Sequence, residues 1–291
     1  MKFYIIIPVH NRLKDTLSCL ESLQGQTEEN WDKEIIIIDD GSTDGTKEVL
    51  STKYPDIKLL CGDGTLWFTE SVNMGINYVL NRSKDDDFIL IINNDTILAS
   101  NYIENLILAI NNNPNSIIGG ILVDSNDKNT ILEDGIYYNK FRFKFYTYKK
   151  WKTVEEINIQ HFNNVEILPT RGIAIPVSVF KEIGLMDSKN FPQAASDYDF
   201  TLSARQYGYK LIVSYDCIIY SENNFGHIPT DKNISLKEFI KSYTNIKSSY
   251  NVKVFMKFGI KHFKQYKLFI PGYLFRILLG SMNRYFRSKI L

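Results

Sequence analysis

Residues 88–96 read Phe-Ile-Leu-Ile-Ile-Asn-Asn-Asp-Thr, and this stretch decides the fold that we expect. The five apolar residues are mostly β-branched and form a short run, which is typical of a strand buried on both faces of a parallel sheet. The run stops on two amides and a carboxylate, Asn93, Asn94 and Asp95. Because ligands of open α/β sheets bind beyond the carboxyl ends of the strands, Asp95 is well placed to hold a metal or a phosphate-bearing ligand.

Strand and helix patterns alternate at short spacing before this stretch. Apolar runs over residues 3–9, 34–38 and 57–61 predict strands, and apolar residues at helical spacing over 12–24 and 70–80 predict helices. Such alternation predicts an α/β fold with a mostly parallel, doubly wound central sheet and helices on both faces.

The pattern continues less regularly after Asp95. Residues 131–148 are rich in aromatic and β-branched side chains, which predicts exposed antiparallel strands or a hairpin that frames an acceptor site. A polar loop is expected over 151–164. The remaining expected elements are helices over 102–110, 177–183 and 196–207 and strands over 116–123, 173–176 and 210–220.

The last sixty residues differ in character from the rest. Residues 232–291 hold 13 Lys/Arg and a single acid, Glu238, for a net charge of +12, whereas the remainder carries −11. Apolar residues over 268–282 span only 15 positions and include Pro271-Gly272, whereas a spanning helix needs about 20. We therefore divide the chain into a domain over 1–231 and a basic helical extension over 232–291.

Two interpretations of this extension remain open. Aromatic rings among lysines are typical of a segment that lies on an anionic membrane surface. The alternative is a helical hairpin that packs on the preceding domain with a solvated basic face. Nucleic acid is not an expected partner, because no recognised binding motif accompanies the charge.

The cysteines and the N-terminus indicate a cytoplasmic setting. Cys19, Cys61 and Cys217 lie far apart, without metal-type spacing, and are expected to be buried thiols in a reducing compartment. The first residues lack the features of a signal peptide and are expected to form the first strand.

Four stretches together resemble the family 2 glycosyltransferases, which have the GT-A fold. The resemblance covers about residues 1–227 and looks closest to bacterial surface-polysaccharide enzymes, including rhamnosyltransferase-like members. Such enzymes transfer a sugar from a nucleoside diphosphate to an acceptor hydroxyl with inversion at the anomeric carbon. The stretches are Ile7-Pro8-Val9-His10-Asn11-Arg12, Asp39-Asp40-Gly41-Ser42-Thr43-Asp44-Gly45-Thr46, Asn93-Asn94-Asp95 and Ser196-Asp197-Tyr198-Asp199.

The resemblance implies a set of donor-binding residues. Asp40 matches a carboxylate that accepts a hydrogen bond from a pyrimidine ring N–H, which implies a UDP- or dTDP-sugar. Arg171 is expected to contact the donor diphosphate or sugar, and Trp67 and Phe68 either line the donor pocket or pack in the core. The other residues expected along the donor are Pro8, His10, Asp63, Gly64, Asn73, Asn93 and Asn94.

The resemblance also implies a divalent cation, Mn²⁺ or Mg²⁺. The family usually has an Asp-x-Asp-like motif where this chain has Asn93-Asn94-Asp95, so the first carboxylate is an amide here. Such ions prefer oxygen ligands and one or two carboxylates suffice for Mg²⁺, so Asp95 is the expected ligand. His227 is either a further ligand or incidental.

Asp197 is the expected catalytic base. In the family an acidic pair precedes a helix, and Ser196 replaces the first acid here. A carboxylate can accept the acceptor proton as the bond from the sugar to the diphosphate breaks. The alternative is that Ser196 and Asp199 form a capping box that only starts the helix.

These expectations describe an enzyme on the cytoplasmic face of the cell membrane. The processive polymer synthases of the family normally carry a Gln-x-x-Arg-Trp sequence, and none occurs here. The resemblance therefore implies that one sugar, or few, is added per binding event to a glycan or lipid-linked acceptor. Two alternatives remain: a sugar nucleotidyltransferase, and a catalytically weakened, membrane-associated protein that binds nucleotide sugars.

Overall fold

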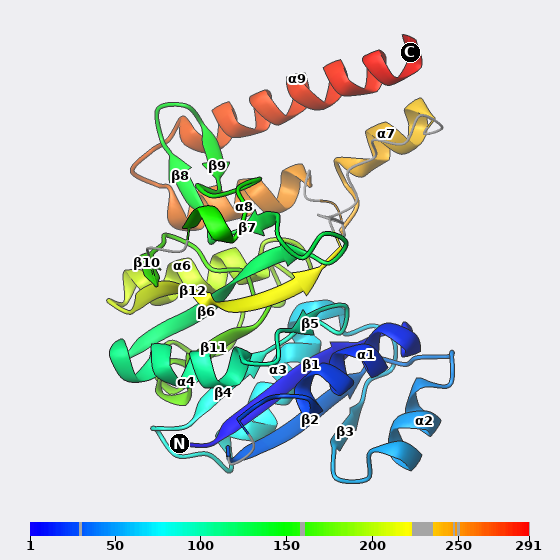
Figure 1. The fold of residues 1–291 in the computed structure, drawn as a ribbon. Coiled ribbons are helices and arrows are strands. Elements are labelled where there is room, and N and C mark those ends of the chain that lie inside the picture. Colours follow the sequence, from blue (N-terminus) through cyan, green and yellow to red (C-terminus); the bar gives the residue numbers. More distant parts are fainter. Residues whose placement is uncertain (29–30, 158–160, 223–234, 247, 249–250, 291) are drawn as a thin grey trace.

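A single large sheet runs through the molecule (Figure 1). The computed structural model describes residues 1–28, 31–157, 161–222, 235–246, 248 and 251–290. The strand order is β10-β12-β6-β11-β4-β1-β2-β3, with β5 beside β12 and β7 beside β6. The bounds are β1 Phe3–Val9, β2 Lys33–Asp39, β3 Lys58–Cys61, β4 Phe88–Ile91, β5 Ile97–Leu98, β6 Ser116–Asp124, β7 Ile131–Glu133, β10 Phe162–Asn164, β11 Ile173–Pro176 and β12 Lys210–Ser221.

The sheet is mostly parallel, which confirms the prediction, but one central strand is reversed. β4, β1, β2 and β3 run parallel to one another, and β12 runs parallel to β6. β11 lies antiparallel between β4 and β6, with Ile173 opposite Ile91. Because of this reversal, the residues that precede β11 lie at the edge where β4 ends. Arg171 is thereby brought to the edge that carries Asn93 and Asp95.

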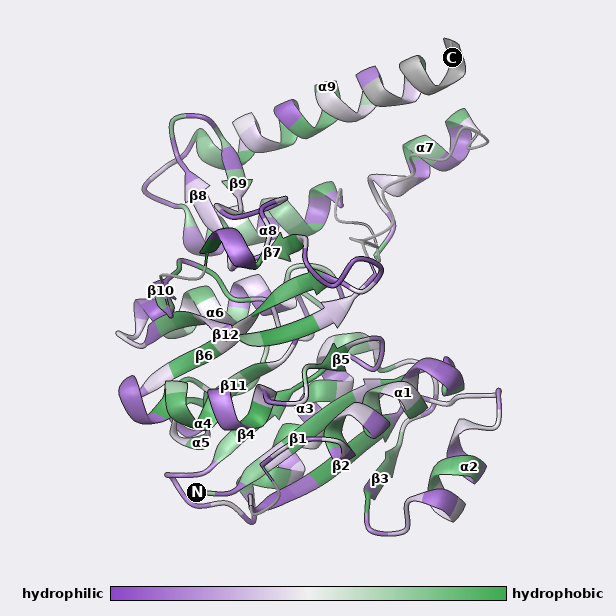
Figure 2. Cartoon of the chain, in the orientation of Figure 1, coloured by the Kyte–Doolittle hydropathy of each residue, from purple (hydrophilic) through white to green (hydrophobic). Residues whose placement is uncertain are grey.

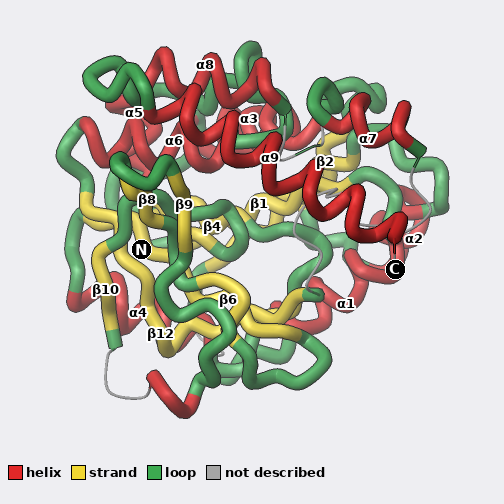
Figure 3. The backbone as a smooth tube through the Cα atoms, turned by 90° about the horizontal axis from the view of Figure 1, so that it is seen from above, coloured by secondary structure: helices red, strands yellow, loops and turns green. Residues whose placement is uncertain are grey.

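Helices cover both faces of the sheet (Figure 3). α1 (Leu13–Gln24), α2 (Thr46–Lys53) and α4 (Tyr102–Asn112) pack on one face. α3 (Trp67–Leu80), α5 (Val177–Ile183) and α6 (Ser196–Gln206) pack on the other. Alternate side chains of β1 point into the two layers, with Ile6 in one core and Ile5 in the other. This explains why the strands are continuous apolar runs, which Figure 2 shows in green.

The middle of the chain contains more regular structure than we predicted. The predicted hairpin is present as β8 (Tyr137–Asn139) and β9 (Lys144–Tyr146). The prediction of a loop over 151–164 was wrong in part, because this segment forms a short 3-10 helix, Glu155–Ile157, and strand β10. β10 pairs with β12, a long-range contact without a local sequence signal.

The cysteine prediction holds for two of the three residues. Cys19 and Cys217 are buried, whereas Cys61 is exposed. Cys61 is the last residue of β3, the strand at one end of the sheet. Within the described residues no further strand pairs with β3, which leaves its end open to solvent.

Part of the C-terminal extension packs on the rest of the chain. The extension forms α7 (Leu236–Ser242), α8 (Val252–His262) and α9 (Phe269–Ile290). Phe258 and Phe269 are almost fully buried, in a cluster that also contains Phe145 of β9 and Leu202 of α6. The alternative of a packed helical hairpin therefore holds for α8 and the start of α9, and these rings are not available to a membrane.

Polar contacts fix the same interface. Asp199 of α6 is buried, and its carboxylate lies 2.8 Å from Lys261 Nζ and 2.7 Å from His262 Nε2. Lys261 and His262 are the last residues of α8. The ring contacts and this paired carboxylate together anchor α8 to the helix that carries Asp197.

The outer part of α9 keeps an apolar stripe on its surface. Figure 1 shows α9 extending away from the sheet, with α7 beside its far end. The exposed apolar residues of α9 recur at helical spacing: Phe275, Leu278, Leu279, Met282 and Phe286. Among the helices of the described residues, none combines the length and the apolar character needed to cross a bilayer.

Candidate functional site

The candidate site lies at the edge of the sheet where β4, β1, β2 and β3 end. These strands are parallel and adjacent, so the segments that follow them converge. His10 follows β1, Asp40 follows β2, and Gly64 and Asn93 follow β3 and β4. The structure thus brings together the strand-end residues that were predicted to bind the donor.

Asp40 ties three of these segments together. Its Oδ1 accepts the N–H of Gly64 at 2.8 Å, and its Oδ2 accepts the N–H of Trp67 at 3.2 Å. Its main-chain oxygen lies 2.5 Å from Nδ1 of His10. Asp40 is buried. We call the loops joined by Asp40 the strand-end cradle: residues 10–12 after β1, 40–45 after β2 and 62–67 after β3.

The backbone of the cradle is unusual. Gly41 has φ +67°, and a Cβ there would lie 2.8 Å from the main-chain nitrogen of Gly64. Asn11, Arg12 and Trp67 also have positive φ, between 59° and 63°. Such conformations cost of order 1–3 kcal/mol each for non-glycine residues and cluster at functional sites. Their position around Asp40 supports a ligand-binding role for this edge.

The end of β4 supplies oxygen atoms to the same edge. Asp95 is exposed, and its Oδ2 accepts a hydrogen bond from Arg12 Nη1 at 2.7 Å. The side-chain oxygen of Asn93 is buried and has no hydrogen-bond partner among the described residues. Asn94 points elsewhere, because its Nδ2 donates to Thr16 Oγ1 at 3.0 Å.

These oxygens fit the kind of cation that was predicted. Hard divalent cations take carboxylate, amide and water oxygens, and the orphaned oxygen of Asn93 beside Asp95 offers such a set. Among the described residues, no group of three or more His, Cys, Asp and Glu side chains forms a ready-made metal site. His227, the other predicted ligand, lies outside the described residues. An ion at Asp95 would compete with Arg12 for this carboxylate.

Asp197 sits in the first turn of α6. The helix follows Ala195, which has φ 61°, and Asp197 Oδ1 accepts the N–H of Tyr198 at 2.9 Å. Burial raises the pKa of Asp197 above its ordinary value, while that hydrogen bond and the charge of Arg171 oppose the rise. A raised pKa makes this carboxylate a stronger base. Arg171 therefore acts on Asp197 from the end of β4, the strand next to β1.

The capping-box alternative for this helix does not hold. Ser196 Oγ donates to the main-chain oxygen of Gln193 at 3.3 Å, and no side chain caps the N-terminus of α6. The carboxylate of Asp199 instead pairs with Lys261 and His262. Ser196 and Asp199 therefore do not form a capping box.

Other residues that were predicted to bind the sugar-nucleotide donor make contacts within the protein. Both amide atoms of Asn73 bond the main chain of Met186, at 2.9 and 3.0 Å, and the residue is buried. Asn73 thus holds the segment before α6 against α3. Asp63 is exposed and accepts hydrogen bonds from Thr65, which lower the pKa of Asp63. Pro8 lies within β1, opposite Ile38.

Glu133, the last residue of β7, was missed by sequence reasoning. Burial raises the pKa of Glu133 to about 7, and the charges of Arg171 and Asp197 act on it. It lies within the segment that was expected to form a hairpin. No local pattern distinguishes it from the neighbouring Asp134, so its proximity to Asp197 is visible only in the fold.

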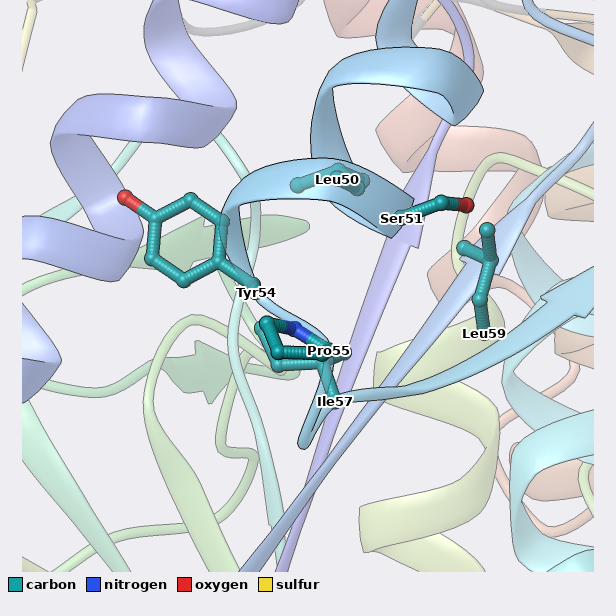
Figure 4. A pocket seen from close by; sticks show the side chains of 6 residues that line it. All are labelled: Leu50, Ser51, Tyr54, Pro55, Ile57 and Leu59. Atoms are coloured by element: carbon teal, nitrogen blue, oxygen red, sulfur yellow. The ribbon is translucent and has the colours of Figure 1, made fainter.

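Two surface hollows lie apart from these residues. One, of about 220 Å³, lies between α2 and β3 and is lined by aliphatic side chains, Tyr54 and Ser51, without a charged group (Figure 4). The other, of about 520 Å³, lies beside β5 and the end of β12. Neither is lined by a predicted site residue.

Comparisons with known proteins identify the family. Residues 4–168 match "Glycosyl transferase family 2". Glycosyltransferase GlyG of Streptococcus pneumoniae is 27% identical over 214 residues, which are 69% of this chain and 65% of the relative. Glycosyltransferase AglE of Haloferax volcanii is 23% identical over 224 residues, 74% of this chain and 64% of the relative. The chain thus spans slightly under two thirds of the length of each relative.

Solved structures show the same fold at low identity. Mannosyltransferase PcManGT from Pyrobaculum calidifontis, in complex with GDP-Man and Mn²⁺, superposes with a TM-score of 0.60 at 15% identity, over 99% of this chain and 73% of that one. S. aureus TarS 1–349 superposes with a TM-score of 0.54 at 16% identity, over 99% and 81%. Since the family match covers more than half of the chain and the fold agrees, this chain belongs to glycosyl transferase family 2 and has the GT-A fold.

Proposed function

We propose that this chain is an inverting glycosyltransferase that moves a sugar from a UDP- or dTDP-sugar to a hydroxyl of a glycan or lipid-linked acceptor. We place this reaction in the synthesis of a bacterial surface polysaccharide. The observation that carries the proposal is the position of Arg171 beside the end of β4, from where its charge acts on Asp197. One cation thereby connects the sheet edge that carries the strand ends to a partly buried carboxylate of raised basicity.

The strand-end cradle would hold the nucleoside diphosphate. Asp40 is buried and keeps the loop backbones close together. Each carboxylate oxygen has more than one acceptor site, so Asp40 can bond the backbone and still accept from a pyrimidine ring N–H. Arg12 and Arg171 supply positive charge at the same edge, and guanidinium groups bind phosphate oxygens strongly.

Asp197 would act as the general base. It accepts the proton of the acceptor hydroxyl while that oxygen bonds the anomeric carbon of the donor sugar. The electron pair of the breaking carbon–oxygen bond goes to the diphosphate, and attack from the opposite side inverts the anomeric centre. The raised pKa of Asp197 favours this proton transfer because it reduces the mismatch with a sugar hydroxyl.

A divalent cation, Mn²⁺ or Mg²⁺, is the cofactor that we propose. Asp95 and Asn93 would hold it, with His227 as a further ligand. When bound, such an ion stabilises negative charge on a leaving diphosphate. The structure of PcManGT in complex with GDP-Man and Mn²⁺ supports this part of the proposal.

We further propose that the extension contacts an anionic membrane at the cytoplasmic face of the cell. The apolar stripe of α9 is exposed, and the extension carries a net charge of +12. Apolar side chains beside basic ones are the features of a helix that lies at a lipid surface. A lipid-linked acceptor would be presented at that surface.

A donor screen tests the activity. The purified chain is mixed with UDP-, dTDP- and GDP-sugars, with and without Mn²⁺, and binding is measured by calorimetry and hydrolysis by nucleotide release. We expect one uracil or thymine nucleotide sugar to bind and to be hydrolysed slowly, with Mn²⁺ increasing both. If no nucleotide sugar binds under any of these conditions, the proposed activity is wrong.

A further inference from the structure

We propose that Lys261 and His262, at the end of α8, are positioning residues for the general base Asp197. They would act through the carboxylate of Asp199, which they hold two residues further along α6. This inference rests on the proposed function, because it takes Asp197 as the base. It gives the C-terminal extension a part in sugar transfer that is separate from membrane contact.

The carboxylate of Asp199 is buried and bound by α8 on both oxygens. Its Oδ1 accepts a hydrogen bond from Nε2 of His262 at 2.7 Å, and its Oδ2 accepts one from Nζ of Lys261 at 2.8 Å. The side chain of His262 is 0% exposed. Its other ring nitrogen lies 3.3 Å from Nε2 of Gln206, the last residue of α6. His262 therefore joins α8 to the first turn and to the last residue of α6.

Lys261 also spans the connection that leads into α6. Its Nζ lies 3.8 Å from Oδ2 of Asp187, before the helix, and 2.8 Å from Asp199, in the first turn. It lies 5.8 Å from the centre of the Phe191 ring, within the same connection. Because these contacts share one ammonium group, they limit how far the start of α6 can move from the segment before it.

The first turn of α6 depends on such contacts from outside the helix. No side chain caps its N-terminus, and Ala195 before it has φ 61°. An uncapped helix start leaves main-chain N–H groups without partners in the helix. A positive φ is unfavourable for a residue other than glycine and persists only where the surroundings impose it. The turn that carries Asp197 is therefore fixed by its neighbours and not by its own cap.

Asp197 and Asp199 point to different sides of α6. An α-helix turns by roughly 100° per residue, so side chains two residues apart lie about 200° apart around its axis. Asp199 is buried against α8, whereas Asp197 is only partly buried. Between them in sequence, Tyr198 has its ring 6.5 Å from that of Phe258 on α8. α8 therefore holds the turn from a side that Asp197 does not face.

Loosening this turn should slow the chemical step more than it weakens donor binding. A general base must lie within hydrogen-bond reach of the proton that it accepts, and a displacement of about 1 Å can cost about 10²-fold in rate. The nucleotide would bind at the strand-end cradle, which is built by the loops after β1, β2 and β3. The proposal therefore predicts a lower kcat with little change in donor affinity.

Hydrogen exchange tests the coupling between α8 and α6 without an activity assay. The N–H of Asp199 is bonded within the first turn at 2.9 Å, so the exchange of the peptide over 195–200 reports on that turn. We expect this peptide to exchange about tenfold faster in His262→Met and in Lys261→Met, because Asp199 keeps fewer partners in each.

Lys257→Met is the matched control for the exchange measurement. It removes an exposed lysine one turn earlier on the same helix, so it makes the same change of charge as Lys261→Met. The control should leave the exchange of the first turn of α6 unchanged. Equal exchange in the wild type, Lys261→Met and His262→Met, or the same increase in the control, would overturn the proposal.

Kinetics test the role in catalysis. With the donor found by the screen and alkyl glycosides as acceptors, His262→Met should lower kcat about tenfold or more, and Lys261→Met about three- to tenfold. The donor Kd and the acceptor KM should stay within about threefold of the wild type. His262→Gln keeps an N–H donor for Asp199, so it should retain kcat within about threefold. Lys257→Met should resemble the wild type.

Three results would contradict the positioning role. The first is a kcat within about twofold of the wild type in both His262→Met and Lys261→Met, which would make α8 a structural support alone. The second is a donor affinity that falls as much as kcat, which would indicate a general loss of the fold. The third is a His262→Gln enzyme that is as impaired as His262→Met.

Two features keep these tests decisive. The side chain of Lys261 is 42% exposed, so Lys261→Met should fold even if His262→Met does not. If the wild type binds no nucleotide sugar, the proposed function fails, whereas hydrogen exchange still decides whether α8 holds the first turn of α6.

Discussion

Arg12 and Asp95 form an ion pair at the proposed metal site. Their side chains are 2.7 Å apart and both are exposed. The guanidinium therefore occupies the place of a cation beside the only carboxylate of the Asn93-Asn94-Asp95 segment. An arriving divalent ion competes with Arg12, which is then free to bind a phosphate oxygen.

Substitutions at these two residues should change cation affinity in opposite directions. Exposed ion pairs contribute about 0.2–1 kcal/mol, so Arg12→Gln should strengthen Mn²⁺ binding to the nucleotide-free protein by about two- to fivefold. Asp95→Asn should weaken it by about tenfold or more, because a charged ligand is lost. Electron paramagnetic resonance of free Mn²⁺ measures both affinities, with Lys14→Gln as the control. Equal affinities in all four proteins would exclude Asp95 as a ligand.

Glu133 should make stability depend on pH. Folding raises the pKa of Glu133 to about 7, from about 4.3 in the unfolded chain. The folded state therefore binds the proton of Glu133 more tightly than the unfolded state does. This difference adds to the free energy of unfolding in full below about pH 4.3, and the added stability is lost as the pH rises to about 7.

Replacing Glu133 by glutamine should remove this dependence. Between about pH 5 and pH 8, Glu133→Gln should gain about 1–3 kcal/mol of unfolding free energy relative to the wild type. Urea denaturation at the two pH values measures the difference, and Glu104→Gln, the control at an exposed acid of α4, should show none. If the difference in unfolding free energy between Glu133→Gln and the wild type stays constant with pH, Glu133 has the same pKa in the folded and the unfolded protein.

At the scale of elements, the sequence predicted the strands and their ends well. Strand β1, Phe3–Val9, has the predicted bounds, and β4 starts at the predicted residue. Runs of isoleucine buried on both faces are a local signal, and so are the polar residues and glycines that end them. Asp40, Asn93 and Asp95 could be placed at one edge for this reason.

Contacts between distant segments could not be predicted in the same way. Asp199 bonds His262, 63 residues later, and Phe145 of β9 packs among rings of α8 and α9. A run of aromatic residues among lysines has the same local pattern whether it faces lipid or a protein core. Only the partner surface on α6 and the β8–β9 hairpin decides between them. Glu133 could not be identified from the sequence for the same reason, because no local pattern marks it.

The burial of α8 can be tested with two residues of one helix. Phe258 is fully buried and Met256 is 51% exposed. Phe258→Ala should reduce the free energy of unfolding by about 3–5 kcal/mol through lost burial and a cavity. Met256→Ala should change it by less than about 1 kcal/mol. Urea denaturation of the full chain measures both, and similar small effects would mean that α8 is not packed as described.

At the scale of the whole molecule, α9 extends beyond the sheet (Figure 1). Its apolar stripe is exposed. Removing the whole extension would also remove α8 from the core, so a deletion cannot test membrane contact cleanly. A single charge on the stripe is a better probe. Leu279 is 53% exposed, so its substitution leaves the aromatic cluster intact.

Leu279→Glu should weaken binding to vesicles that contain about one third phosphatidylglycerol by about tenfold, because it removes apolar contact and adds a negative charge. Thr52→Glu makes the same change of charge on α2, where Thr52 is exposed, and should have little effect. Vesicle co-sedimentation measures the bound fraction. Equal binding of the two variants would refute a membrane role for the stripe.

The central claim is that Asp197 takes the acceptor proton while the strand-end cradle binds the donor independently. The most direct measurement compares donor affinity and sugar transfer in Asp197→Asn, with Asp85→Asn, an exposed acid just before β4, as the control. We predict that transfer falls by about 10²–10⁴-fold, while the donor Kd stays within about twofold of the wild type and the control keeps both. Transfer that survives in Asp197→Asn, or an equal loss of donor affinity, would contradict the account.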